Sequence, residues 1–175
     1  MTYKQEKIIG SLVILTFWII IIGIVLVSKF YLQNKGDVTE TNTQETNKVV
    51  LDDYSQSIYS LSNEYRNQNG IESLKLNSKL TQAAQNKADD LCNNNYWSHQ
   101  LKDGEGFEIF VTETGYKYEL LGENLGRKFN SPERLMNAWK GSESHNKNLL
   151  ENYKETGIGF NECDGLNITA VSFAR

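Results

Sequence analysis

Three side chains in this sequence can bind a metal ion or transfer a proton. They are His99, His145 and Glu123, and the 175 residues contain no further histidine. His99 closes an aromatic Tyr-Trp-Ser-His segment, and Glu123 follows Gly122 in the stretch that runs from Leu121 to His145. Imidazoles and carboxylates are common zinc ligands and common acid–base catalysts. The sequence therefore predicts a cleft in which these three side chains converge.

Each of these residues also has a plainer interpretation. A glutamate in a glycine-flanked turn, as predicted for Glu123, commonly caps a helix or accepts main-chain hydrogen bonds, and from the residues alone this interpretation is favoured. A histidine beside aromatic rings is usually a structural or surface residue. Trp97 and Trp139 are most simply core or cleft-wall residues. Arg66 fits a solvated helix position as well as a structural anchor.

Apolar periodicity predicts two helices ahead of His99. The first has apolar residues at helical spacing from Tyr54 to Tyr65 and stops at Asn69-Gly70. The second is capped by Asn77 or Ser78. Its narrow apolar face consists of small and branched side chains, Leu80, Ala83, Ala84, Ala88 and Leu91. Three asparagines then end the pattern and place His99 on a loop.

The second half of the domain is predicted to mix short helices and strands. A short helix lies between Phe107 and Gly115, and an edge strand begins at Tyr116 and Tyr118. A helix that begins at Ser131-Pro132 has an apolar stripe and delivers His145 at its far end. Finally, alternating residues on both sides of Asp164-Gly165 predict a two-stranded hairpin.

The first 50 residues differ in composition from the rest of the chain. The uncharged run from Ile8 to Val27 is long enough, as a helix, to cross the roughly 30 Å hydrocarbon core of a membrane. It lacks the small-x-small site at which a signal peptide would be cleaved. We therefore expect a cytoplasmic flank at 1–7, a transmembrane signal anchor at 8–28, a flexible linker at 29–50 and an extracytoplasmic domain at 51–175.

Net charge and cysteine content indicate which ligands and which bonds to expect. The formal net charge is -4, and nothing in the sequence indicates a nucleic-acid surface. Cys92 and Cys163 are an even pair in the part of the chain expected outside the membrane, one near a helix end and one beside the hairpin turn. Oxidising conditions there permit a disulfide, so we predict that the two are joined.

A series of short motifs spans residues 54–175. In order, the motifs are Asn63-Glu64-Tyr65-Arg66 with Asn69-Gly70 and Leu74; Trp97-Ser98-His99; Gly122-Glu123-Asn124-Leu125; Ala138-Trp139 with Ser142 and His145; Asn148-Leu149-Leu150; and Gly157-Ile158-Gly159. Their order and spacing resemble the CAP superfamily, also called SCP-like extracellular domains, in its bacterial branch. No single motif is specific, but the whole ordered series is hard to obtain by chance.

The resemblance implies an α+β fold, an α-β-α sandwich with a small antiparallel sheet between helical layers, and a cleft with two histidines and two acids. His99, Glu123 and His145 match three of these four positions, and the fourth is Ser142, as in bacterial members with Trp-x-x-Ser-x-x-His. Glu108 and Glu143 are nearby acids, but neither matches the motif. With the resemblance, the cleft interpretation leads: these four residues are expected to bind ligand, and the first three to bind a metal, with zinc as the expected ion.

Three functions are compatible with this sequence. The favoured one is a membrane-tethered extracytoplasmic domain whose His/Glu cleft binds a divalent metal and a small-molecule, lipid, peptide or cell-envelope ligand. The alternative is a metal-dependent, peptidase-like hydrolase that uses the same cleft, with His99, Glu123 and His145 as catalytic candidates. Against it, the chain has no His-Glu-x-x-His helix, and Ser142 leaves no assigned general base. The third is a structural surface domain with a vestigial cleft.

Overall fold

The computed structural model describes residues 49–175. The predicted membrane segment from Ile8 to Val27 and most of the predicted linker lie outside these residues. None of the helices described in 49–175 is both long and apolar enough to span a bilayer. In chain order the elements are α2 (Asp53–Gln68), β1 (Lys75–Leu76), α3 (Ser78–Asn93), α4 (Glu108–Glu113), β2 (Leu121–Arg127), α5 (Pro132–Lys140), α6 (Glu143–Leu150), β3 (Glu155–Cys163) and β4 (Leu166–Ala174).

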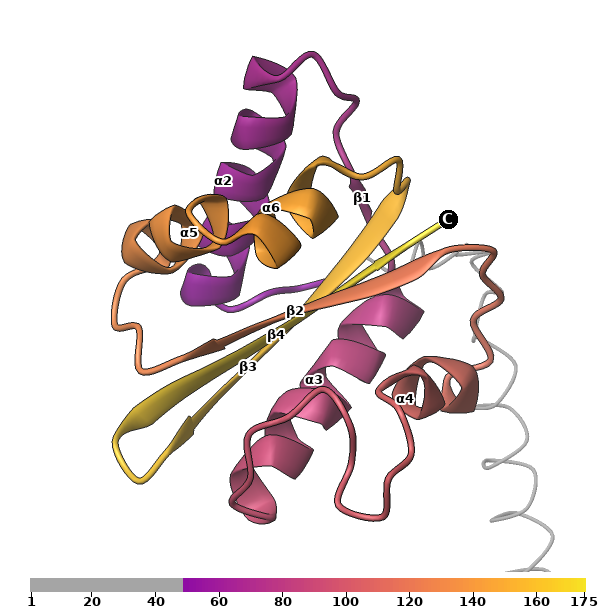
Figure 1. The fold of residues 1–175 in the computed structure, drawn as a ribbon, viewed down its shortest axis with the longest axis vertical. Helices are drawn as coiled ribbons and strands as arrows, with labels where there is room; N and C mark the ends of the chain where they lie inside the picture. Colours follow the sequence, from indigo (N-terminus) through magenta and orange to yellow (C-terminus); the bar gives the residue numbers. More distant parts are fainter. Residues whose placement is uncertain (1–48) are drawn as a thin grey trace, which may run out of the picture. The chain divides into compact units, whose positions relative to one another are not determined.

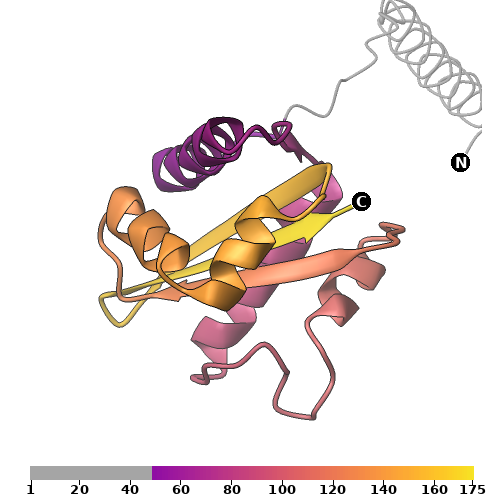
Figure 2. The ribbon, with the colours of Figure 1, turned by 45° about the horizontal axis from the view of Figure 1, so that its top comes forward.

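One sheet lies between two layers of helices, as the resemblance implied. Helices α2, α5 and α6 cover one face, and α3 and α4 cover the other (Figures 1 and 2). The four strands follow the order β1-β3-β4-β2. The expected purely antiparallel sheet is wrong in one respect, because β1 pairs in parallel with β3, Lys75 opposite Glu155. The sheet is therefore mixed.

Strand β4 is the centre of the core because both of its faces are buried. Val171 and Phe173 pack among the side chains of α2, α5 and α6. Ala170 and Ala174 pack on the opposite face, against residues of α3. A strand covered on both faces reads as a nearly continuous apolar run, which is the pattern from Ile168 onward.

Helix α3 packs directly on the backbone of β3, and glycine makes this approach possible. A methyl group at Gly157 would overlap the main chain at Leu80 and Thr81, and one at Gly159 would overlap the main chain of Ala84. Main-chain atoms cannot move aside as a flexible side chain could. The Gly-Ile-Gly motif therefore fixes the distance between helix and sheet.

The predicted helix starts and the predicted hairpin are confirmed. Asn77 caps α3, its side chain accepting hydrogen bonds from the main-chain N–H groups of Lys79 (2.9 Å) and Leu80 (3.3 Å). The short helix near Phe107 is α4. Strands β3 and β4 pair as an antiparallel hairpin around Asp164 and Gly165.

Three local predictions are wrong. Glu123 lies not in a turn but in strand β2, opposite Ser172 of β4. Tyr116 and Tyr118 are irregular, because pairing with the end of β4 begins only where the N–H groups of Glu119 and Leu120 reach the carbonyl of residue 175.

The third correction concerns the element that carries His145. The helix that begins at Pro132 ends at Lys140, with Gly141 as its C-cap. Ser142 then has an extended backbone, and a separate helix, α6, begins at Glu143. His145 therefore lies in the first turn of α6 and not at the far end of the preceding helix.

The predicted disulfide is present. Cys92 and Cys163 are joined, with their Cα atoms 5.7 Å apart, which lies within the normal range for such a bridge. The bond ties the end of α3 to the end of β3 and closes a long segment of chain. It therefore reinforces the same helix–sheet contact that the glycines permit.

Candidate functional site

The predicted site residues are assembled around β2, a strand at the edge of the sheet. Side chains alternate between the two faces of a strand. Leu125 packs with residues of α3, so Glu123, two residues earlier, points to the same face. Asn124 points to the face of α6, where its amide donates to the carbonyl of His145 (3.1 Å). The loop after α3 and the first turn of α6 thus approach β2 from opposite faces.

Glu123 and His99 form a direct pair. Nδ1 of His99 lies 2.7 Å from Oε1 of Glu123, and the side chains are 53% and 1% exposed, respectively. Burial raises the pKa of the Glu123 carboxyl, while the bond to His99 and the charge of Lys87 act in the opposite direction. If Nδ1 carries the proton of this bond, Nε2 of His99 keeps its lone pair.

Lys87 is a site residue that sequence reasoning missed. It is 1% exposed, and its Nζ donates to the hydroxyl of Tyr96 (3.0 Å) and to the carbonyl of His99 (3.3 Å). Tyr96 in turn donates to the carboxylate of Asp90. Burial lowers the pKa of Lys87, and the charge of Glu123 acts against this. The sequence did contain a signal for this burial. Lys87 lies seven residues, or two helical turns, after Leu80 and therefore lies on the buried face of α3.

His145 and Ser142 form the second pair. Nδ1 of His145 lies 2.8 Å from Oγ of Ser142, the residue that precedes α6. Burial lowers the pKa of His145, and the charge of His99 lowers it further. The buried Trp139 ring lies 6.5 Å from the His145 ring and donates its Nε1 proton to the carbonyl of Leu125 (2.9 Å).

Two asparagine amides connect the halves of the site, and sequence reasoning gave them no role. Asn148 Nδ2 donates to the carbonyl of Glu123 (2.9 Å) and to Oδ1 of Asn124 (2.9 Å). Since Asn124 is fully buried and bonded to the main chain of His145, the network fixes α6 against β2. The motif residues Glu123, Asn124 and Asn148 thus form one continuous set of hydrogen bonds.

The donors that could hold a metal ion are the two imidazoles. Among residues 49–175, no group of three or more His, Cys, Asp or Glu side chains is arranged to hold an ion. The three-ligand set of His99, Glu123 and His145 therefore stays a prediction. The structure shows two imidazoles, each with a partner on Nδ1. Within the described residues no hydrogen bond occupies either Nε2. The charge of Glu108 also raises the pKa of Glu123.

Two curated proteins of Bacillus subtilis are similar to part of this chain. The chain is 30% identical over 129 residues to YkwD of Bacillus subtilis (strain 168), a match that covers 73% of this chain and 50% of YkwD. It is 26% identical over 113 residues to the membrane protein YlbC of the same organism, covering 64% of this chain and 33% of YlbC. The chain thus matches half or less of the length of these curated relatives.

Solved structures share the fold. An SCP-domain extracellular protein from Bacillus anthracis superposes with a TM-score of 0.65 at 24% identity, covering 70% of this chain and 40% of that one. An outer surface protein from Borrelia burgdorferi gives a TM-score of 0.67 at 22% identity, covering 73% of this chain and 96% of that one. At such identities the likeness concerns the fold alone.

A family profile settles the relationship. Residues 59–173 match that of the cysteine-rich secretory protein family, CAP, and this span holds the histidine pairs, the disulfide and the whole sheet except its last residue. The chain belongs to the CAP family.

Proposed function

We propose that this chain is a membrane-anchored extracytoplasmic CAP domain that binds a divalent cation, with zinc preferred, through Nε2 of His99 and Nε2 of His145. The cation would help to hold a small or cell-envelope ligand. One observation carries the proposal: Nδ1 of each imidazole has a partner, Glu123 at 2.7 Å and Ser142 at 2.8 Å. Such partners set the tautomer and the ring orientation of metal-binding histidines.

The available donors fit zinc better than they fit a hard cation. Neutral imidazole suits Zn²⁺, whereas Mg²⁺ and Ca²⁺ prefer sets of oxygen ligands. In this proposal Glu123 acts through His99: its buried carboxylate holds the Nδ1 proton and raises the basicity of Nε2. Lys87 fixes the main chain of His99, and the Asn148 network fixes the helix that carries His145.

Ligand binding is favoured over hydrolysis because no residue of this site is free to act as a general base. When bound, zinc would supply Lewis acidity and coordination positions for a ligand. A hydrolase would also need a general base. Ser142 has no charge, and the carboxylate of Glu123 is already bonded to His99. We therefore assign this site to ligand capture.

The anchor is the second part of the proposal. The uncharged run from Ile8 to Val27 would place Met1 inside and the domain outside, where the disulfide can persist. YlbC, a relative, is a membrane protein by name. Protease added to intact cells should degrade the domain. If the domain stays intact while the cells are sealed, the orientation is wrong.

Calorimetry on the tag-free, full-length chain tests the metal site. His99→Ala and His145→Ala should each abolish measurable zinc binding. Glu123→Gln should weaken it by about 10- to 100-fold, since it removes the charge behind His99. Glu143→Gln removes an exposed acid from the same turn of α6 and is the matched control, with less than a threefold change expected. Unchanged affinity in both histidine variants would exclude the site, and peptide turnover lost in Glu123→Gln would favour the hydrolase.

A further inference from the structure

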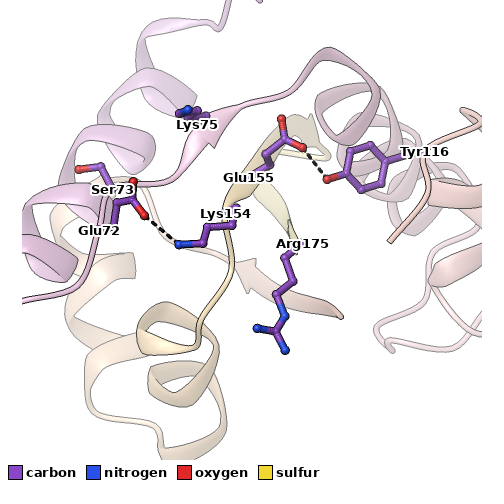
Figure 3. A pocket seen from close by; sticks show the side chains of 7 residues that line it. All are labelled: Glu72, Ser73, Lys75, Tyr116, Lys154, Glu155 and Arg175. Atoms are coloured by element: carbon purple, nitrogen blue, oxygen red, sulfur yellow. Dashed lines mark hydrogen bonds and ion pairs between the residues drawn. The ribbon is translucent and has the colours of Figure 1, made fainter. Parts of the chain in front are cut away.

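A cavity of about 500 Å³ lies at the end of the sheet and includes none of the residues of the histidine site. Figure 3 shows the side chains that line it. Its charged and phenolic members are Glu72, Lys75, Tyr116, Lys154, Glu155 and Arg175. The volume falls in the range of sites that bind small molecules.

The strand register concentrates cations at this end of the sheet. Lys75 of β1 lies opposite Glu155 of β3, and Glu155 lies opposite Ala174 of β4. Lys154 and Arg175 lie just beyond this register, where the N–H of Lys154 donates to the carbonyl of Ala174 (2.9 Å). Lys75, Lys154 and Arg175 therefore all line the cavity at this end of the sheet.

The cations at this end are only partly neutralised by the protein. Nζ of Lys154 lies 2.8 Å from Glu72, and both side chains are more than half exposed. Within residues 49–175, neither Lys75 nor Arg175 forms an ion pair. In Figure 3 the side chain of Arg175 points away from both the Glu72–Lys154 pair and the Tyr116–Glu155 pair. Two cationic groups therefore stay available to a ligand.

Glu155 supplies the opposite charge, and the protein holds it with neutral donors. Its Oε2 accepts a hydrogen bond from the hydroxyl of Tyr116 (2.6 Å), and its Oε1 accepts one from Nδ2 of Asn77 (3.0 Å). Burial and this bond raise the pKa of Tyr116, so the phenol stays protonated and donates. No cation pairs with Glu155 within the described part of the chain. Each of its oxygens still has a lone pair for a ligand's donor.

We propose that this cavity binds the charged ends of a short peptide, a ligand that carries both a free carboxylate and a free ammonium group. The carboxylate binds the guanidinium of Arg175, which can donate two parallel hydrogen bonds. The ammonium group binds Glu155. A simple anion fits less well, because Glu155 would repel it. The site operates independently of metal binding at His99 and His145.

A set of four related probes tests the zwitterionic assignment. The probes are alanyl-alanine, its N-acetyl derivative, its C-terminal amide and the doubly blocked peptide. Each is titrated into the full-length chain in detergent, and amide NMR shifts report the affinity. Blocking either end should weaken binding at least fivefold. The proposal is overturned if alanyl-alanine binds no more tightly than the doubly blocked peptide, or if the N-acetyl derivative binds equally well.

Two charge-removing variants then assign each end of the probe. Arg175→Gln should weaken alanyl-alanine at least fivefold and leave the C-terminal amide unaffected. Glu155→Gln keeps the shape and should weaken only the probes that have a free ammonium group. Arg134→Gln and Glu64→Gln remove the same charges from exposed helix positions outside the cavity and should change nothing. If both cavity variants bind alanyl-alanine like the wild-type chain, the site does not exist.

Discussion

Replacing Arg66 by methionine should destabilise the domain more than any other substitution of a charged residue. Arg66 is 1% exposed and forms no ion pair within residues 49–175. Its guanidinium instead donates to four main-chain carbonyls, those of Glu72 (2.9 Å), Leu149 (2.8 Å), Glu151 (2.9 Å) and Tyr153 (3.2 Å). The side chain thus ties α2 to the segment between α6 and β3. It is the structural anchor, and the solvated interpretation is excluded.

The magnitude follows from the burial of these bonds. The bonds to Leu149 and Tyr153 are buried, whereas those to Glu72 and Glu151 are only partly buried, so water can replace the latter pair. A hydrogen bond from a charged donor contributes about 1.5–3 kcal/mol, and the abandoned carbonyls stay buried. Methionine fills most of the volume and avoids the cost of burying a charge. We therefore expect Arg66→Met to lose about 4 kcal/mol of a stability that is typically about 5–15 kcal/mol.

Urea unfolding, followed by tryptophan fluorescence, measures this difference. Arg134→Met is the matched control, because Arg134 is exposed on α5 and its one side-chain hydrogen bond within residues 49–175, to Asn130, is long at 3.4 Å. That variant should stay within about 0.5 kcal/mol of the wild-type chain. If Arg66→Met loses less than about 1 kcal/mol, the carbonyl bonds do not hold the two layers together and the reasoning fails.

Three further outcomes are expected. Gly157→Ala should cost about 3 kcal/mol in urea unfolding by overlap with α3, while Gly141→Ala, which meets only ordinary contacts, should be tolerated. The double variant Cys92→Ala/Cys163→Ala should lose about 4 kcal/mol, the chain-entropy value for a 71-residue separation, and a wild-type chain that is equally stable with and without reductant would contradict this. Burial lowers the pKa of His145 below its usual 6.5, so the unfolded chain binds this proton more readily and metal-free stability should fall as pH drops below about 6.5. His145→Gln should make the stability of the metal-free chain less dependent on pH in this range. An unchanged pH profile in this variant would contradict the prediction.

The sequence predicted those parts of the fold that depend on local patterns. A cap at Asn77 or Ser78 was identifiable, and so was the hairpin turn at Asp164-Gly165, because each is determined by nearby residues. The parallel partner of β3 could not be predicted, since a two-residue strand such as β1 has no periodicity. Its pairing depends on where α2 ends and α3 begins.

The wrong turn around Glu123 has a specific physical cause. Gly122 and Gly126 suggested a turn, but they are glycines because their positions are crowded. A methyl group at Gly122 would overlap the hydroxyl of Tyr153, and one at Gly126 would overlap Leu135. The glycines therefore let side chains from the α5 and α6 layer pack onto a strand. Such a tertiary contact leaves no signal in the local sequence.

For the candidate site, too, the sequence predicted the residues but not their contacts. The residue types and their spacing were sufficient to select His99, Glu123 and His145, but not to show which atoms meet. That Glu123 binds Nδ1 of His99, and that Ser142 binds Nδ1 of His145, depends on how β2 and α6 pack. Lys87 escaped detection because a lysine was taken as polar, although its position on α3 is a buried one.

Zinc titration followed by long-range ¹H–¹⁵N NMR tests the central claim most directly. The chain has only two histidines, so their four ring nitrogens can be assigned with single variants. In the tag-free full-length protein at pH 7, stoichiometric zinc should shift Nε2 of both His99 and His145, while Nδ1 of His99 stays protonated against Glu123. If both imidazoles keep their metal-free shifts, or only one of them responds, the two-histidine site is contradicted.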